Sequence, residues 1–295
     1  MLSRDFMIAG VLALAVSAVP VFAADEKNFT YLALGDSVAF GFDPTVAAPT
    51  PDKFTGYPEV VAAVQHLLKS KKEVNAACPG ETSTSFLVAG APDNGCQQFK
   101  AIIGLHTNYT GTQAQFAVMQ LLANRHINLV TLSIGGNDLL LLQKQCSTAP
   151  SFADCVRAML PGVLQLYGQN LAQIMMAFRV QAHYPGTLVL VKQYSPSSDP
   201  LFIRTVAALN SVMMQVGSQV GAKFADGFTA FQLASALTQG DPCQAGLLIH
   251  LNATTCDVHP SPLGRDLLAA AVLFAIGDGD FNSDNNNNDN NNDDH

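Results

Sequence analysis

Short apolar runs recur along this chain, and each is followed by a polar or glycine-containing segment. Runs of this length, enriched in Val, Ile and Leu, are typical of buried β-strands rather than helices. The third run, near the middle of the chain, is dominated by apolar residues, which suits the centre of a parallel sheet. The predicted strands are Phe29–Leu34, Glu73–Ala77, Ile127–Ile134, Thr187–Tyr194 and Ala222–Asp226.

Segments with apolar residues three and four positions apart separate these runs and indicate helices. In Tyr57–Lys72, for example, Val60, Val61 and Val64 share one helical face, and lysines close the C-terminal end. Strands that alternate with helices predict a parallel sheet covered on both faces, hence a single α/β domain. The other predicted helices are Gln113–Asn124, Leu160–Ala182, Phe202–Val220 and about Ser261–Ala275.

Four residues that are candidates for catalysis follow predicted strands or precede the last helix. Ser37 follows the first strand, Gly80 the second, and Asn137 the third, while His259 lies just ahead of the C-terminal helix. Ligands of open α/β sheets bind beyond the carboxyl ends of the strands. We therefore expect these four residues to converge at one edge of the sheet, which a simple Gly-Asp-Ser turn at Ser37 would not explain.

The four residue types suit acyl transfer. A serine hydroxyl becomes a good nucleophile when a base removes its proton, and histidine is the usual base near neutral pH. The tetrahedral intermediate needs hydrogen-bond donors for its oxyanion. The backbone N–H groups of Ser37 and Gly80 and the side-chain amide of Asn137 are three candidates, with His259 as the base. This chemistry requires no cofactor and no metal.

Four segments of the sequence resemble the blocks of the GDSL, or SGNH, hydrolase family. They read GDSVAFG, NAACPGETS, SIGGND and DVHPSPLG, in the family's order, and the resemblance extends from Tyr31 to about Ala275. It implies a flavodoxin-like three-layer α/β/α sandwich that hydrolyses esters. It also implies that Ser37 is the nucleophile, that His259 is the base, and that the oxyanion donors are those just named.

The acid of the expected triad departs from the family pattern. The family commonly places it three residues before the histidine, where this chain has Cys256, whereas Asp257 lies two residues before His259. In an extended segment, alternate side chains point to the same side, so Asp257 could reach the imidazole. A backbone carbonyl could orient His259 instead, leaving Asp257 a local capping role. We favour Asp257 as the third catalytic residue.

The two ends of the chain differ from the domain between them. Met7–Phe22 is apolar and is followed by small residues that suit cleavage after Ala23, so residues 1–23 are predicted to be a signal peptide for secretion or periplasmic export. The alternative is an uncleaved membrane anchor, although the run is short for a span. Residues 24–277 form the predicted hydrolase domain, and the Asp/Asn-rich residues 278–295 a disordered tail.

Six cysteines follow the predicted signal peptide. An even number in an exported chain indicates disulfides, and pairing neighbours along the sequence is the simplest connectivity. No CxxC spacing is present, so a zinc site is not expected. The predicted pairs are Cys78–Cys96, Cys146–Cys155 and Cys243–Cys256.

Charge and composition indicate which kinds of molecule the protein binds or acts on. The net charge of −8 arises mostly from six aspartates in the tail, and residues 24–277 carry about −2 with no basic cluster, which argues against nucleic acid. We expect a monomer without a membrane span after cleavage, acting on a small-molecule or lipid ester. The absence of Trp slightly favours acyl chains over sugars as the group that the site binds. Residues 42–56 and 95–112 are expected to shape the substrate pocket. A carbohydrate acetylesterase and an inactive secreted binding module remain alternatives.

Overall fold

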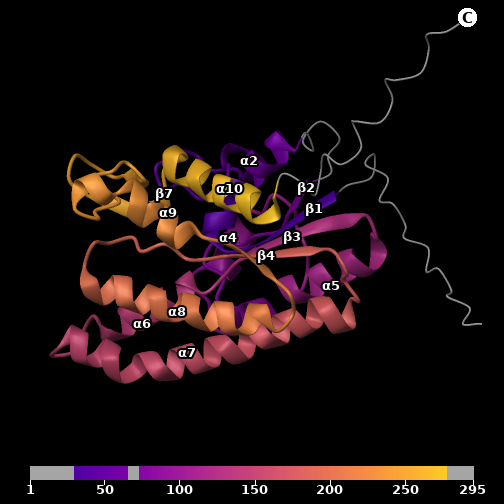
Figure 1. Cartoon of the computed structure of the whole chain (residues 1–295), viewed down its shortest axis with the longest axis horizontal. Helices are drawn as coiled ribbons and strands as arrows, with labels where there is room; N and C mark the ends of the chain where they lie inside the picture. Colours follow the sequence, from indigo (N-terminus) through magenta and orange to yellow (C-terminus); the bar gives the residue numbers. More distant parts are fainter. Residues whose placement is uncertain (1–29, 66–72, 278–295) are drawn as a thin grey trace, which may run out of the picture.

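A five-stranded parallel sheet forms the centre of the molecule in the computed structural model, which describes residues 30–65 and 73–277 (Figure 1). The strand order is β2-β1-β3-β4-β5, the order of flavodoxin-like folds. The predicted flavodoxin-like α/β fold is therefore confirmed. The strands are β1 (Thr30–Gly35), β2 (Glu73–Asn75), β3 (Ile127–Ser133), β4 (Thr187–Val191) and β5 (Lys223–Ala225).

Helices cover both faces of the sheet and complete three layers. In Figure 1 one layer contains α2 (Tyr57–Val64), α9 (Gly227–Ala234) and α10 (Pro262–Ile276). The opposite layer contains α5 (Gln113–Ala123), α7 (Phe152–Met176) and α8 (Pro200–Ser218). The remaining elements are α1 (Ser37–Phe40), η2 (Pro51–Lys53), α3 (Ser83–Leu87), α4 (Cys96–Ile102), α6 (Gly136–Cys146), η4 (Ala177–Gln181), η5 (Ala236–Thr238), β6 (Leu248–His250) and β7 (Cys256–Pro260).

The register of the central strands sets the position of the loops that follow them. Leu132 of β3 pairs with Leu34 of β1 on one side and with Leu190 of β4 on the other. These three side chains are buried on one face, and the adjacent Thr131 and Val189 are buried on the other, so both faces of the sheet are covered. The carboxyl ends of β1, β3 and β4 therefore lie level, and their loops emerge together at one edge.

Several elements differ from the sequence prediction. Helix α7 begins at Phe152, eight residues before the predicted start, and continues through Pro161. The side chain of Ser151 caps its N-terminus by accepting a hydrogen bond from Asp154 N. The helices α4 and α6 and the hairpin β6–β7 were not predicted. The predicted helix from Tyr57 is described only as α2, because residues 66–72 lie outside the described residues.

Three disulfides join neighbours along the sequence, as predicted. Cys78–Cys96 links the loop after β2 to α4, Cys146–Cys155 links α6 to α7, and Cys243–Cys256 holds the start of β7. All six cysteines of the chain are paired.

The predicted signal peptide (1–23) and tail (278–295) lie outside the described residues. Within residues 30–65 and 73–277, none of the helices has the length and apolarity that crossing a bilayer requires.

Candidate active site

Ser37 stands on a turn that only a narrow set of residues can form. At Gly35, where β1 ends, φ is +134°, and a Cβ would overlap the carbonyl oxygen of Ser133 on β3, so glycine is required. The Asp36 side chain caps the short helix α1 by accepting a hydrogen bond from Val38 N at 3.1 Å. Ser37 is the first residue of α1 and reaches the carboxyl edge of the sheet.

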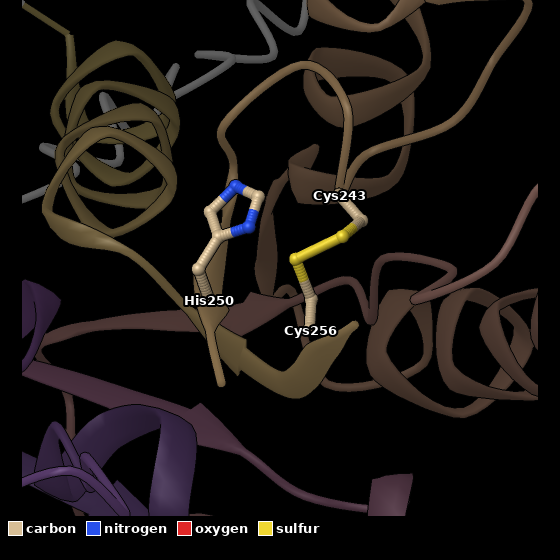
Figure 2. A group of neighbouring side chains, drawn as sticks. All are labelled: Cys243, His250 and Cys256. Atoms are coloured by element: carbon tan, nitrogen blue, oxygen red, sulfur yellow. A yellow bond between two sulfur atoms is a disulfide. The ribbon is translucent and has the colours of Figure 1, made fainter. Parts of the chain in front are cut away.

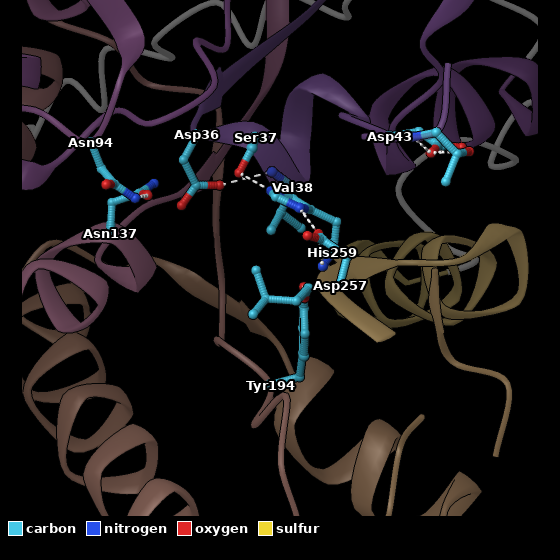
Figure 3. Close-up of polar contacts among 11 residues, drawn as sticks. Asp36, Ser37, Val38, Asp43, Asn94, Asn137, Tyr194, Asp257 and His259 are labelled. Atoms are coloured by element: carbon cyan, nitrogen blue, oxygen red, sulfur yellow. Dashed lines mark hydrogen bonds and ion pairs between the residues drawn. The ribbon is translucent and has the colours of Figure 1, made fainter. Parts of the chain in front are cut away.

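The histidine and the acid reach Ser37 from the last strand of the chain. Strand β7 is extended, so Asp257 and His259 point to the same side. The Asp257 carboxylate contacts Nδ1 of His259 and also accepts a hydrogen bond from the His259 backbone N at 3.0 Å. On the other side of the ring, Nε2 lies 2.8 Å from Ser37 Oγ (Figure 3). The three side chains thus form a continuous hydrogen-bonded row.

Neighbouring groups fix the position of β7. The Tyr194 hydroxyl, from the loop after β4, donates a hydrogen bond to the Val258 carbonyl at 2.7 Å (Figure 3). The ring of Phe42 packs edge-on against the His259 imidazole, with 5.0 Å between centroids. These contacts hold the histidine against the sheet edge independently of Ser37.

The charge state of Asp257 follows from this arrangement. Burial alone would raise the pKa of Asp257, but the hydrogen bonds from His259 and its positive charge when protonated outweigh that effect and hold the pKa below its ordinary value. The carboxylate is therefore ionised at neutral pH and is suited to stabilise an imidazolium.

Asn137 lies across the site from His259 (Figure 3), and Asn94 joins it to Gly80, because Asn94 N donates a hydrogen bond to the Gly80 carbonyl at 2.8 Å. Gly80 has φ +88°, and a Cβ there would lie 2.5 Å from the Asn94 carbonyl oxygen. Asn137 Nδ2 donates to the Glu81 carbonyl at 3.0 Å, and its Oδ1 accepts from Asn94 Nδ2 at 2.9 Å (Figure 3). This orientation leaves the second hydrogen of Asn137 Nδ2 available to a substrate. Asn94 lies in a loop without a recognisable motif, so sequence analysis missed it.

A buried polar network ties the loop after β2 to the end of β1. Gln113, at the start of α5, donates through Nε2 to the Gly35 carbonyl and to Glu81 Oε2, both at 3.0 Å. Glu81 also accepts a hydrogen bond from Ser85 Oγ. Neither Gln113 nor Glu81 was singled out from the sequence, because their partners come from distant segments.

Glu81 is only 3% exposed, and its ionisation is unfavourable. Burial raises its pKa from 4.5 to about 7, although hydrogen bonds from Ser85 and Gln113 oppose the shift. Because the folded state binds this proton more tightly than the unfolded state, the stability contributed by protonated Glu81 is present below about pH 4.5 and is lost as pH rises to about 7.

Replacing Glu81 by glutamine should therefore stabilise the protein at pH 8. Glutamine mimics the protonated acid, so the variant avoids an ionisation cost on the order of 3 kcal/mol. Urea unfolding at pH 5 and pH 8 measures the effect, with the two proteins similar at pH 5 and the variant more stable at pH 8. A variant less stable than wild type at pH 8 would mean that ionised Glu81 stabilises the fold.

The side chains of Cys243, His250 and Cys256 lie close enough together to resemble a metal site (Figure 2). The two sulfurs are joined to each other, however, whereas a metal requires thiolates. His250 is exposed, and its Nδ1 lies 3.3 Å from the Asn252 carbonyl. This group is a disulfide beside a surface histidine. Cys78, Glu81 and Cys96 also lie close together, and there too the two sulfurs form a disulfide.

Comparisons with known proteins bear on the family and the fold of the chain. The model of the GDSL-like lipase/acylhydrolase family matches residues 33–267. The acetylxylan esterase Axe2 from Geobacillus stearothermophilus has a similar structure, with a TM-score of 0.53 and 20% identity over 84% of this chain and 94% of Axe2. LAE5, an alpha/beta hydrolase enzyme from the metagenome of Lake Arreo, Spain, gives a TM-score of 0.54 and 17% identity over 84% of this chain and 95% of LAE5. No curated protein sequence matches the chain.

Proposed function

Because the chain belongs to the GDSL-like lipase/acylhydrolase family and is a carboxylic ester hydrolase, we propose that it works through an acyl-enzyme on Ser37. His259 Nε2 takes the proton of the Ser37 hydroxyl as Oγ attacks the ester carbonyl. The protonated His259 then gives this proton to the leaving alcohol as the C–O bond breaks. In the second half of the reaction, His259 deprotonates a water molecule that attacks the acyl-enzyme. The carboxylic acid is released as His259 returns this proton to Ser37 Oγ.

The distance of 2.8 Å between Ser37 Oγ and His259 Nε2 is the observation that carries this proposal. A general base must lie within hydrogen-bond reach of the proton that it removes, and this pair meets the requirement without rearrangement. The contact joins residues 222 positions apart in sequence, from α1 and β7. The tertiary fold therefore brings together a nucleophile and a base that are far apart in the sequence.

Three donors are proposed to stabilise the oxyanion. These are the N–H groups of Ser37 and Gly80 and the free hydrogen of Asn137 Nδ2. Fixed donors of this kind stabilise the charge that develops in the transition state, typically by 100- to 1,000-fold in rate for each donor. The hydrogen bonds of Asn137 to Asn94 and Glu81 support this role, because they hold the amide in a single orientation.

Asp257 is proposed as the third catalytic residue. Its contact with Nδ1 would keep the proton of His259 on that nitrogen, which leaves Nε2 free to accept from Ser37. The same carboxylate would stabilise the imidazolium that forms during each proton transfer. The low pKa of Asp257 supports this role, since a neutral acid could not balance the positive charge.

Covalent labelling tests the proposal against an inactive binding module of the same fold. A fluorophosphonate should phosphonylate Ser37, and peptide mass spectrometry should locate the adduct there, because phosphonylation requires an activated serine. Heat-unfolded protein is the matched control and should remain unlabelled. Folded protein that takes up no label and hydrolyses no ester would favour the binding module.

We also propose that the protein is exported. Three disulfides among the described residues support this, since disulfides persist in oxidising compartments. The predicted signal peptide would direct the chain to the periplasm or the exterior.

A further inference from the structure

An apolar pocket opens at Ser37 and His259 and extends between the helices α6, α7 and α8. Asp36 and His259 are the only acidic or basic side chains among the described residues that line it. The predicted pocket segments, residues 42–56 and 95–112, do not contribute to its lining, so that expectation was wrong. The walls are formed mainly by Leu139, Leu140, Leu142, Phe152, Val156 and Phe202.

Two polar side chains in the pocket wall are engaged within the protein. Thr205 Oγ1 donates to the Leu201 carbonyl at 2.8 Å. Gln193 Nε2 donates to Ser133 Oγ at 3.1 Å. A sugar ring placed here would lose hydrogen bonds to water and find few partners in return, which is unfavourable. An alkyl chain would lose no hydrogen bonds to water on entering the pocket.

The pocket wall is built as a small apolar core of its own. Leu142 and Val156 are buried together with Cys146, separately from the main core. The disulfide between Cys146 and Cys155 joins the end of α6 to the start of α7 at this place. The wall is thus held in position before any ligand enters, which lowers the ordering cost of binding.

The length of the pocket can be measured along α8. On α8 the residues that line the pocket run from Leu201 to Val206. These two positions are five residues apart, or roughly 8 Å along the helix axis. Within this stretch the ring of Phe202 stacks with that of Phe152, with 6.1 Å between centroids. An extended hexanoyl or octanoyl chain has about this length.

We propose that this pocket binds the alkyl chain of the acyl group, and that the enzyme is therefore selective for esters of medium-chain fatty acids rather than for carbohydrate acetates. The inference rests on the proposed acyl-enzyme at Ser37. In that intermediate the acyl group stays attached to Oγ while the alcohol leaves, so a pocket that opens at Ser37 serves both halves of the reaction. Asn137, the proposed oxyanion donor, and Leu140 one turn later lie on the same helix. The ester carbonyl and the alkyl chain of the substrate would therefore contact consecutive turns of α6.

The wild-type enzyme should prefer octanoyl over acetyl esters. Each methylene buried contributes about fourfold to kcat/KM until the chain reaches the stacked rings. Among nitrophenyl esters from acetate to palmitate, we expect the optimum between hexanoate and decanoate. Ethyl octanoate should also be a better substrate than octyl acetate, because the pocket receives the acyl side. The reverse preference, or an optimum at acetate, would overturn the inference.

Two variants test whether this pocket is responsible. Val206→Phe places a larger side chain in the pocket lining and should lower kcat/KM for octanoate by roughly 50-fold while leaving acetate within about twofold, the loss corresponding to about three methylenes. Met214→Phe, at an exposed position of the same helix, is the matched control and should change neither ester. Phe202→Ala should instead move the optimum to longer chains, and it tests the inference even if Val206→Phe does not fold.

The outcomes separate this inference from the proposed mechanism. Hydrolysis of nitrophenyl acetate with fluorophosphonate labelling of Ser37, but no preference for longer chains, would reject the acyl pocket alone. Equal losses for acetate and octanoate in folded Val206→Phe would reject it as well. Absence of both hydrolysis and labelling would reject the mechanism on which it rests.

Discussion

Replacing Ser37 by alanine should lower kcat for ester hydrolysis by about a million-fold, with the remaining rate set by binding and the oxyanion donors. Without Oγ, His259 has no nucleophile to deprotonate, and no acyl-enzyme can form. The fold should be unaffected, because the cap that Asp36 provides for α1 uses the backbone N–H of Val38 and not the serine hydroxyl. Initial rates on nitrophenyl octanoate, with active-site titration of the wild type, measure the effect.

The control for this experiment is Ser195→Ala. Ser195 is also buried at the carboxyl edge of the sheet, but its Oγ donates its hydrogen bond to the Ser197 carbonyl and not to His259. This variant should keep activity within a few-fold of the wild type. If Ser37→Ala instead retained more than about one per cent of wild-type kcat, a different nucleophile would be at work, since loss of a nucleophilic serine is far more severe.

The fold and most of the candidate site could be predicted because their signals are local. Each strand is a short apolar run, and Ser37, Gly80 and Asn137 each follow such a run directly. Parallel strands bring their carboxyl ends to one edge, so the order of motifs along the chain is sufficient to predict that they converge. The disulfide pairing was predictable for a similar reason, because each partner lies within 18 residues of the other.

The features that were missed depend on contacts between distant segments. Asn94 and Gln113 act on the site through hydrogen bonds to Asn137, Gly35 and Glu81, and no periodicity or motif marks them. The pocket wall was assigned to the wrong loops because it is formed by α6, α7 and α8. Of these, α6 was not predicted at all, and α7 starts before a proline that would ordinarily mark a helix start.

The spacing of Asp257 and His259 left two interpretations open, because the backbone conformation between them decides which contacts form. The hairpin β6–β7 was not predicted from the sequence, yet it makes this segment extended. In an extended strand the two-residue spacing places both side chains on the same side, whereas a three-residue spacing would place them on opposite sides. Cys256, which occupies the family's usual acid position, is instead held by its disulfide to Cys243.

Replacing Asp257 by asparagine should therefore lower kcat about 10,000-fold while leaving KM nearly unchanged. The amide of asparagine can donate to Nδ1, which would put the histidine proton on Nε2, where it blocks acceptance from Ser37. It would also leave the imidazolium without a counter-charge. Stopped-flow and steady-state rates on one ester give kcat and KM separately. Asp226→Asn is the control and should have little effect on kcat, since the Asp226 carboxylate pairs with Lys192 and not with His259.

A loss of less than about tenfold in Asp257→Asn would mean that a backbone carbonyl orients His259. Asp257→Ala distinguishes the two effects of the asparagine amide. Alanine removes the charge without offering a donor to Nδ1, so the histidine can still adopt the productive tautomer for part of the time. If the tautomer dominates, Asp257→Ala should be more active than Asp257→Asn. If the missing counter-charge dominates, the two variants should be equally slow, because neither can balance the imidazolium.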